Sequence, residues 1–432
     1  MNGIPKILKE VLEKINPPEK DLKFISNSLK NFLKKFEKEI KKQKIKAEVF
    51  IGGSFAKGTM IKKDVYDIDI FVRFDRIYNK ANVDISNLLQ KIIKSLKINF
   101  IKIHGSRDYF RIQQRKDFFI ELIPVLKISS PKEAENITDL SYSHVKYIKR
   151  KIKNEKLKNE IKIAKAFCHA NRVYGAESYI NGFSGYGLEL LIYYYKGFLR
   201  FIKAMSKINI KEKTIIDIER HYPNKNRVLI DMNASKLSSP IILVDPTYKQ
   251  RNALAALSYE TFKKFQTLCK KFLKKPSIKF FEEKKLNLKE LKNYARKYSL
   301  EMLILKARTN KQEGDIAGSK LLKFFKHLEK EILKYFEIKK KEFNYNGKKS
   351  AEYYFIVKSK KYIISQGPFL NDKESVKTFK KAHKKSKFFV KKNKIYAKDK
   401  INFTIKDFLK SWKKNNKKRM KEMSIIELKI IN

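Results

Sequence analysis

The spacing of apolar residues changes several times along the chain, and each change predicts a different element. Residues 21–42 carry apolar side chains every three or four positions with lysines between them, which predicts a helix with one core-facing side. Runs rich in β-branched and aromatic residues predict strands at 47–51, 64–74 and 118–126. Together these elements predict a compact domain of mixed α and β structure over residues 1–150.

The rest of the chain predicts two further domains. Residues 156–207 have mainly helical spacing, interrupted by glycine-bearing turns, and predict a helical central domain over 151–275. Lysine-rich helical stretches then alternate with short strand candidates such as 302–307 (MLILKA) and 353–359 (YYFIVKS). This pattern predicts an α/β C-terminal region over 276–432 that ends in a basic helical tail from about residue 407. The expected fold class is a multidomain α+β protein whose first domain contains a mixed sheet.

The charge of the chain indicates a class of partner. Lysine and arginine number 101 against 45 acidic residues, a net charge of +56 over 432 residues. Such an excess attracts polyanions, and nucleic acid is the leading candidate. Because lysine is abundant throughout, a general compositional bias explains part of this excess, so the charge needs the support of a site.

Cysteine content and hydropathy indicate the cellular compartment. Cys168 and Cys269 are the only cysteines, which excludes a disulfide scaffold or a cysteine zinc site and favours a reducing compartment. Residues 1–15 predict a charged amphipathic helix rather than a secretory signal, and no apolar stretch approaches the roughly 20 residues that span a bilayer. We expect a soluble cytoplasmic protein, monomer or homodimer, with no membrane partner.

Three acidic residues carry the candidate chemistry. Asp67 and Asp69 are two positions apart on the predicted strand 64–74 and therefore point to the same face, whereas Asp64 does not belong to this face. Glu121 on a second strand can join them around hard cations such as Mg²⁺, an arrangement typical of metal-assisted phosphoryl transfer. An edge strand with solvated acids is the structural alternative.

A glycine and a serine ahead of the acids favour the catalytic interpretation. Gly53 lets the backbone approach a phosphate closely, and the hydroxyl of Ser54 and nearby turn amides can bind its oxygens. The segment 52–59 (GGSFAKGT) predicts a turn that opens a short helix. It is not a Walker loop, because Thr59 stands where the lysine should be. A second Gly-Ser pair, at 105–106, has no paired acids downstream and predicts an ordinary turn.

The succession of GGS, DID and a distal strand acid resembles the nucleotidyltransferase superfamily that includes DNA polymerase β. Three longer segments narrow the resemblance: 173–198 (VYGAESYINGFSGYGLELLIYYYKGF), 244–258 (VDPTYKQRNALAALS) and 367–383 (GPFLNDKESVKTFKKAH). These segments are similar to motifs of archaeal, class I CCA-adding enzymes. The likeness runs almost from end to end.

The resemblance implies template-independent addition of C, C and A to the 3′ end of tRNA, from CTP and ATP, with Mg²⁺ as cofactor and pyrophosphate as product. It implies that Asp67, Asp69 and Glu121 bind the metal ions and are catalytic. The nucleotide-binding residues expected at this site are Gly53, Ser54, Lys57, His144, Lys165, Tyr174 and Arg251. Three positions depart from the family pattern, which usually has arginine at 57, often glutamate at 67 and usually aspartate at 121.

Simpler explanations exist for several of these residues. His144 has the character of an ordinary surface or helix-start histidine, Lys165 that of a solvated helix lysine, and Tyr174 that of a packed tyrosine. Two functional alternatives also remain open. One is a poly(A) polymerase or other terminal nucleotidyltransferase, and the other is a non-catalytic RNA-binding protein with the same fold.

The C-terminal region has the composition of a surface that follows an RNA backbone. Its lysines alternate with Phe388, Phe389 and Tyr396, so that positive charge can meet phosphates while aromatic rings stack on exposed bases. For Trp412 we expect packing in a helix interface rather than contact with RNA.

Overall fold

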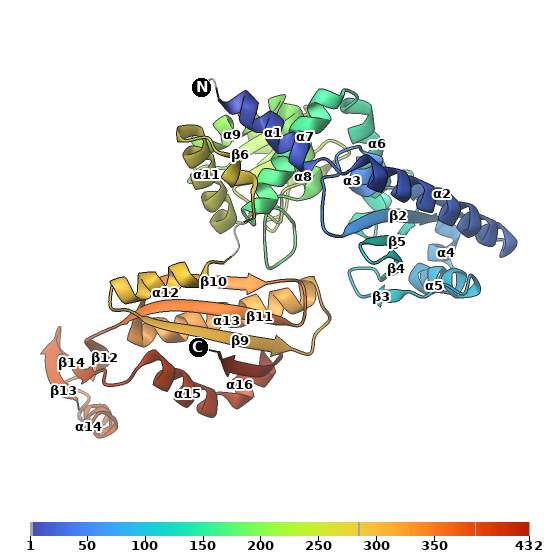
Figure 1. Ribbon diagram of the computed structural model, residues 1–432. Helices are drawn as coiled ribbons and strands as arrows, with labels where there is room; N and C mark the ends of the chain where they lie inside the picture. Colours follow the sequence, from blue (N-terminus) through green and yellow to red (C-terminus); the bar gives the residue numbers. More distant parts are fainter. Residues whose placement is uncertain (1–2, 284–285, 385, 432) are drawn as a thin grey trace. The chain divides into compact units, whose positions relative to one another are not determined.

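The computed structural model describes residues 3–283, 286–384 and 386–431. The chain forms two compact units, Met1–Lys284 and Lys285–Asn432 (Figure 1). The expected domain boundaries near residues 150 and 275 stay predictions.

The first unit contains a five-stranded mixed sheet of order β1-β2-β5-β4-β3. Its strands are β1 (Ala47–Ile51), β2 (Tyr66–Phe74), β3 (Ile101–Ile103), β4 (Tyr109–Arg115) and β5 (Phe118–Leu126). β2 and β5 are parallel, and the other neighbours are antiparallel. The three strands predicted from the sequence are confirmed as β1, β2 and β5, whereas β3 and β4 were not anticipated.

Two helices bury one face of this sheet. They are α2 (Glu19–Lys42), which confirms the predicted helix, and α5 (Ile85–Ser95). Their apolar sides pack with the inward residues of β2 and β5, such as Ile68 and Ile70, in one core. The opposite face of β2 is therefore the one that can carry Asp67 and Asp69. The short elements of this part are α3 (Gly53–Ala56), α4 (Arg76–Lys80), η1 (Pro131–Glu133) and η2 (Ile137–Leu140).

A mainly helical part completes the first unit, as expected. Its helices are α6 (Ser141–Lys151), α7 (Glu155–Ala170), α8 (Gly185–Tyr195), α9 (Phe198–Lys207) and α11 (Tyr259–Lys274). The N-terminal helix α1 (Ile4–Ile15) packs against α7, and both contribute to a second core (Figure 1).

The helical part also holds a small sheet that the sequence did not predict. It has the order β6-β7-β8, with β6 (Thr214–Asp217), β7 (Ile241–Asp245) and β8 (Tyr248–Asn252). Helix α10 (Lys225–Asp231) lies between β6 and β7 in the chain, and η3 (Ile278–Phe281) follows α11. All five residues of β7 are buried, which explains why its apolar run lacks the alternation that marks a half-buried strand.

The second unit contains a four-stranded antiparallel sheet of order β10-β11-β9-β15. Its strands are β9 (Glu301–Thr309), β10 (Phe336–Tyr345), β11 (Ser350–Ser359) and β15 (Ile425–Ile430). The long helix α13 (Asp315–Tyr335) shares the core of this unit with β9, β10 and β11. The strand candidates at 302–307 and 353–359 are confirmed within β9 and β11. Helix α12 (Leu288–Lys297) precedes β9.

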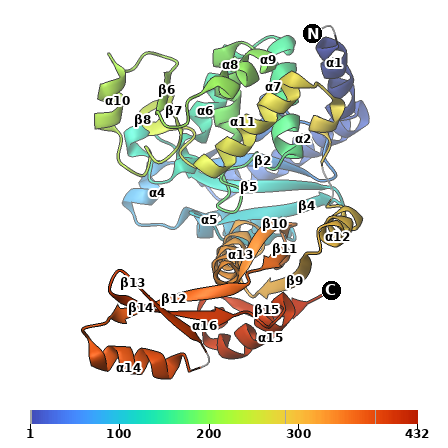
Figure 2. The ribbon, with the colours of Figure 1, turned by 90° about the vertical axis from the view of Figure 1, so that its left-hand side faces the viewer.

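A separate three-stranded sheet of order β12-β14-β13 lies within the second unit (Figure 2). It consists of β12 (Tyr362–Phe369), β13 (Lys387–Lys391) and β14 (Lys394–Lys400), and helix α14 (Lys373–Ala382) packs against β12.

The C-terminal part differs in one respect from the expected helical tail. Helices α15 (Ile405–Asn415) and α16 (Lys417–Glu422) form the basic helical segment, but β15 follows and pairs with β9. Ile425 and Leu428 are buried there, and this burial stabilises a strand where the local sequence reads as an extension of the helix. Trp412 is 6% exposed and lies 6.1 Å from the ring of Phe324, so its expected packing role is confirmed.

Among the described residues, no helix combines the length and apolar character needed to cross a membrane.

Candidate active site

The three candidate acids lie on one face of neighbouring strands. Asp67 and Asp69 alternate on β2 with Ile68 and Ile70, which are buried in the core, so both carboxylates point away from it. In the parallel ladder of β2 and β5, Asp69 is the register partner of Glu121. This register places one acid of a second strand beside the DID pair, while the convergence of all three carboxylates on a metal ion stays a prediction. Asp64 was expected within this strand but off the acidic face; it instead precedes β2 and is exposed.

Bringing the acids together has an electrostatic cost. Burial raises the pKa of Glu121 to about 8, and the charges of Asp69 and Asp67 add to this rise. Burial also raises the pKa of Asp69 to about 6, with Asp67 adding and Lys57 opposing. A site whose carboxylates repel one another in this way is stabilised by any cation that binds between them.

The donor set suits a hard divalent ion, because all three side chains offer carboxylate oxygens. Across the described ranges, however, no three acidic, histidine or cysteine side chains converge closely enough to enclose a metal ion. The guanidinium of Arg111 lies among these acids instead: Nη2 donates to Asp67, and Nε lies 3.6 Å from Glu121 Oε1. A metal ion that binds Asp67 would therefore compete with this guanidinium for the same carboxylate.

Gly53 and Ser54 are the first two residues of α3, the short helix predicted after β1, and Gly53 lies beside Asp69. The backbone N–H of Gly52 donates to the carbonyl of Asp69 at 2.8 Å, which ties the turn to β2. Gly53 has φ +60°, and a Cβ there would lie 1.9 Å from Asp69 Oδ2. Both the left-handed backbone and the close carboxylate require glycine. The second Gly-Ser pair, at 105–106, lies in bends between β3 and β4, which confirms it as a turn.

Lys57 and Lys165 meet at a buried carboxylate that the sequence analysis did not identify. Glu189 of α8 is fully buried and accepts from Lys57 Nζ at 2.6 Å and from Lys165 Nζ at 2.7 Å. The hydroxyl of Thr59 also donates to Glu189, at 2.8 Å. Lys165 is therefore not a solvated lysine, since it is 3% exposed.

The charges of this cluster depend on one another. Burial by itself would raise the pKa of Glu189, but Lys165 and Lys57 outweigh that effect and hold it at about 2. Burial lowers the pKa of Lys165 to about 8, although Glu189 opposes this change. At neutral pH the cluster thus holds one anion between two ammonium groups.

His144 and Arg251 meet at a second buried carboxylate, Asp245 at the end of β7. His144 Nε2 lies 3.0 Å from Asp245 Oδ2, and Arg251 Nη1 lies 2.6 Å from the same oxygen. Tyr186 donates to the other oxygen at 3.1 Å and stacks on His144, with ring centroids 4.0 Å apart. His144 is therefore not an ordinary surface histidine.

These contacts shift the pKa values of His144 and Asp245. Burial lowers the pKa of His144, while Asp245 opposes the change. The pKa of Asp245 is held well below its usual range by His144 and Arg251, against the effect of burial. Because a carboxylate only accepts hydrogen bonds, His144 carries a proton on Nε2.

Tyr174 lies with its ring stacked on His169, at a centroid distance of 4.1 Å. Burial raises the pKa of the Tyr174 hydroxyl and lowers that of His169 to about 4. The two rings form a neutral aromatic pair, consistent with either packing or contact with a base. His169 was not among the predicted residues.

Sequence reasoning missed Glu189, Asp245 and Arg111. A signal existed for the first two, because each is an acid within an apolar run, GLELLI and IILVD, and such a residue needs a buried partner. No comparable signal marked Arg111, whose strand was not predicted.

Two families match parts of the chain. Residues 159–282 match the family described as tRNA nucleotidyltransferase, second domain, and residues 3–151 match the family described as Second Messenger Oligonucleotide or Dinucleotide Synthetase domain.

Three archaeal relatives are named CCA-adding enzyme. That of Nanoarchaeum equitans is 44% identical over 215 residues, which cover 50% of this chain and about half (52%) of that protein. That of Methanocaldococcus jannaschii is 30% identical over 403 residues, 91% of this chain and 87% of that protein. That of Saccharolobus islandicus is 30% identical over 332 residues, 76% of this chain and 72% of that protein.

A solved structure of Cid1, described as having RNA terminal uridylyl transferase activity, resembles the chain with a TM-score of 0.50. It is 14% identical and covers 65% of this chain and 98% of its own. At this identity the likeness concerns the fold alone.

Proposed function

From the premise that this chain belongs to the family of CCA-adding enzymes, we propose that it extends the 3′ end of tRNA with C, C and A, using CTP and ATP. It is a nucleotidyltransferase, a class of enzymes that use divalent metal ions. The observation that carries the assignment of its active site is the placement of Asp67, Asp69 and Glu121 on one face of β2 and β5 beside the Gly53 turn.

We assign the metal-binding role to these three carboxylates and name Mg²⁺ as the ion. Held by these residues, divalent ions would supply Lewis-acid activation of the RNA 3′ hydroxyl and charge neutralisation for the leaving pyrophosphate. The residues of the chain provide the oxygen ligands, and the turn at Gly53 and Ser54 places backbone and hydroxyl groups beside them to bind the triphosphate.

Lys57 and Lys165 supply positive charge for the triphosphate. Glu189 holds both ammonium groups in place, so that they are ordered before the nucleotide binds and less side-chain entropy is lost on binding. Lys57 provides a point charge where the family usually has the two-pronged contact of arginine.

We assign contact with the incoming base and with the RNA end to Arg251 and His144. Asp245 holds both side chains through one carboxylate oxygen, and Tyr186 adds a stacking surface beside His144. A guanidinium fixed in this way presents its remaining N–H groups in one direction, as recognition of base edges requires. Tyr174 offers a further aromatic ring for the nucleotide.

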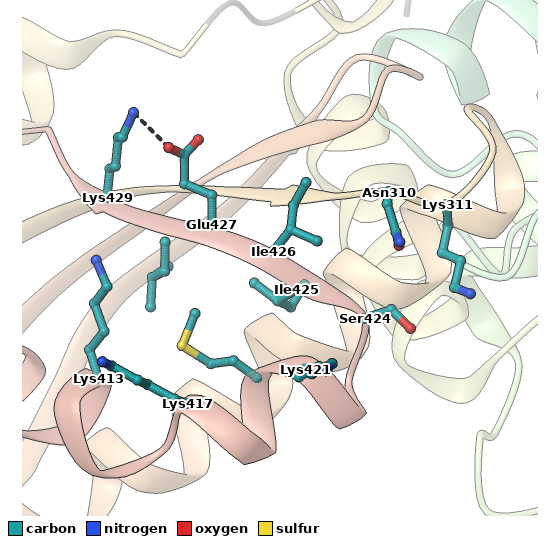
Figure 3. A pocket seen from close by; sticks show the side chains of 12 residues that line it. Asn310, Lys311, Lys413, Lys417, Lys421, Ser424, Ile425, Ile426, Glu427 and Lys429 are labelled. Atoms are coloured by element: carbon teal, nitrogen blue, oxygen red, sulfur yellow. Dashed lines mark ion pairs between the residues drawn. The ribbon is translucent and has the colours of Figure 1, made fainter.

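The second unit provides candidate phosphate contacts around a cavity of about 670 Å³ (Figure 3). The lining has an apolar floor that includes Ile425 and Leu428. Five lysines among the described residues line the same cavity: Lys311, Lys413, Lys417, Lys421 and Lys429. Figure 3 shows Lys413 and Lys417 side by side at this cavity. Such a surface suits a partner whose backbone is bound regardless of its sequence.

The sheet β12-β14-β13 offers a stacking surface as well. Phe389 and Tyr396 are register partners with rings stacked 5.2 Å apart, and Phe389 is 37% exposed. Phe388 points to the other face, where its ring lies 6.4 Å from that of Phe379 on α14. Phe388 is as exposed as Phe389, at 37%. We therefore assign base stacking to the pair Phe389 and Tyr396 and, on the other face, to Phe388.

The test of the proposed function uses tRNA that lacks its three terminal nucleotides. With CTP, ATP and Mg²⁺, the sequenced product ends should read CCA, and addition should then stop. With ATP alone, no adenosine should be added to this tRNA. Tails of adenosine alone would instead identify a poly(A) polymerase and contradict the proposed substrates.

Neutralising the cavity lysines should weaken binding of tRNA. For the triple variant Lys413→Gln, Lys417→Gln and Lys421→Gln, we expect the Kd to rise at least about tenfold and the salt dependence, the slope of log Kd against log salt concentration, to fall by about 2 to 3. Filter binding over a range of salt concentrations measures both quantities.

The matched control neutralises three exposed lysines of the same unit that lie away from the cavity, Lys292, Lys323 and Lys330. It carries the same change in net charge. Equal losses in the two triple variants would show that overall charge, and not this cavity, determines the affinity.

A further inference from the structure

Arg111 lies in line with two of the three catalytic acids across the sheet. On β4 it is the antiparallel register partner of Glu121, which is in turn the register partner of Asp69 on β2. Its side chain reaches Asp67, which lies on the same strand and face as Asp69. The acidic face therefore contains a fourth charged residue, Arg111, which is positive and lies on β4.

The contacts of Arg111 are incomplete. Nη2 donates to Asp67, but Nε, 3.6 Å from Glu121 Oε1, is too distant for a hydrogen bond. Nε is nevertheless buried and has no hydrogen-bond partner among the described residues. The guanidinium lies over the ring of Phe119, 4.1 Å from its centroid. A buried N–H group without a hydrogen-bond partner costs free energy. In the observed position the guanidinium therefore offsets the charge of the acids, but its own Nε–H remains without a hydrogen bond.

We propose that Arg111 is a displaceable counter-cation of the metal site: its guanidinium shields the carboxylates from one another and releases Asp67 when a divalent ion takes the same oxygens. Arg111 is thus a positioning residue that opposes metal binding in the absence of substrate. The inference rests on the proposed function in one respect, the assignment of Asp67, Asp69 and Glu121 as metal ligands.

The physical reason is competition for the same lone pairs. A guanidinium that donates to Asp67 uses an oxygen that a hard cation needs, and the positive charge repels an incoming ion. If Arg111 instead belonged to a fixed scaffold that arranges the acids, its removal would scatter the carboxylates and weaken metal binding. The two roles predict opposite changes in metal affinity.

The test measures binding of Mn²⁺ by electron paramagnetic resonance on the full chain, without nucleotide or tRNA. We expect Arg111→Met to lower the Kd for Mn²⁺ about tenfold, the scale on which residues around a metal site change its affinity. Arg111→Lys keeps the charge but not the forked donor, and should lie between the wild type and Arg111→Met. An unchanged or higher Kd in Arg111→Met overturns the proposal.

Arg115 provides a matched control on the same strand. It also pairs with carboxylates, Asp117 and Asp21, and lies over a phenylalanine ring, that of Phe24, at 4.4 Å. Arg115→Met should leave the Kd for Mn²⁺ within about twofold of the wild type. An equal tightening in this control would show that the effect comes from net charge and would also overturn the proposal.

A second measurement does not depend on the folding of a variant. In the wild-type chain with ¹⁵N-labelled arginine, saturating Mg²⁺ should shift the Nε–H resonance of Arg111 and speed its exchange with solvent. The same resonance of Arg115 should stay in place. If the resonance of Arg111 does not change although Mg²⁺ binds, the guanidinium is not displaced.

The outcomes separate this inference from the proposed function. Wild-type protein that completes CCA ends while Arg111→Met fails to bind Mn²⁺ more tightly contradicts the inference alone. Tighter binding of Mn²⁺ by Arg111→Met, together with a wild type that adds no CCA, contradicts the substrate assignment alone.

Discussion

Replacing Asp69 by asparagine should slow nucleotide addition by about 10³-fold and leave the affinity for tRNA unchanged. A metal ion contributes several kcal/mol to stabilising the charge that develops in phosphoryl transfer, and about 4 kcal/mol corresponds to this factor. Asparagine keeps the size of the side chain but offers a neutral oxygen, a much weaker ligand. Single-turnover addition of CTP to tRNA that lacks its CCA end measures the rate.

The variant should fold at least as well as the wild type. The pKa of Asp69 is raised to about 6, chiefly by burial, which shows that the ionised form is disfavoured where it lies. Above this pH a neutral asparagine avoids that cost, so the thermal unfolding temperature should stay the same or rise. Loss of activity would then reflect chemistry and not unfolding.

Asp64→Asn is the matched control, since Asp64 is exposed and precedes β2. It should retain wild-type addition. If Asp69→Asn also retained it, the acidic face would not be catalytic, and the alternative of a non-catalytic RNA-binding protein would be favoured.

Replacing Glu189 by glutamine should lower the free energy of unfolding of the first unit by about 3 to 5 kcal/mol, the range for a buried ion pair that loses one partner. Glu189 is fully buried and accepts from Lys57 and Lys165. Glutamine would leave these two ammonium groups without an anion and would point its own amide donors at one of them. The affinity for nucleotide should also fall, because the lysines lose their fixed positions.

Hydrogen exchange of the amides of α7 and α8 measures this loss within the first unit. The fluorescence of Trp412, the only tryptophan, reports on the second unit and should be unaffected. Glu10→Gln is the matched control, because it breaks a half-exposed ion pair with Lys14 at 3.1 Å in the same unit. It should change the exchange rates far less.

The effect of pH provides an independent check. Because Lys165 and Lys57 hold the pKa of Glu189 at about 2, below its ordinary value of 4.5, its ionised form favours the folded state. That stabilisation is fully present above about pH 4.5 and is lost as the pH falls toward 2. The difference in stability between the wild type and Glu189→Gln should shrink over this window. A difference that stayed constant would show that the charge of Glu189 does not stabilise the fold.

The elements that the sequence predicted well are those whose burial is one-sided. Alternation along 64–74 predicted both the strand and the shared face of Asp67 and Asp69, because the side chains of a strand point to opposite faces in turn. The spacing over 21–42 predicted α2 for the equivalent reason, since one side of a helix faces a core. The acid positions and the glycine turn follow from local rules of this kind.

Elements without such a pattern were missed or misread. The buried strand β7 shows no alternation, and β15 follows a basic helical stretch but forms a strand because β9 provides its partner. Pairing between segments far apart in sequence depends on the whole fold, and no local propensity encodes it.

By itself the sequence determined which residue types stand on each strand face, that a turn with glycine precedes the acids, and which family motifs the chain carries. Only the tertiary structure decided the partners: Glu121 beside Asp69, Arg111 among the acids, and Glu189 and Asp245 as anchors of the cationic side chains. The reason is physical. The direction of a side chain follows from local backbone geometry, whereas the distance between two charges depends on strand register and helix packing across the chain.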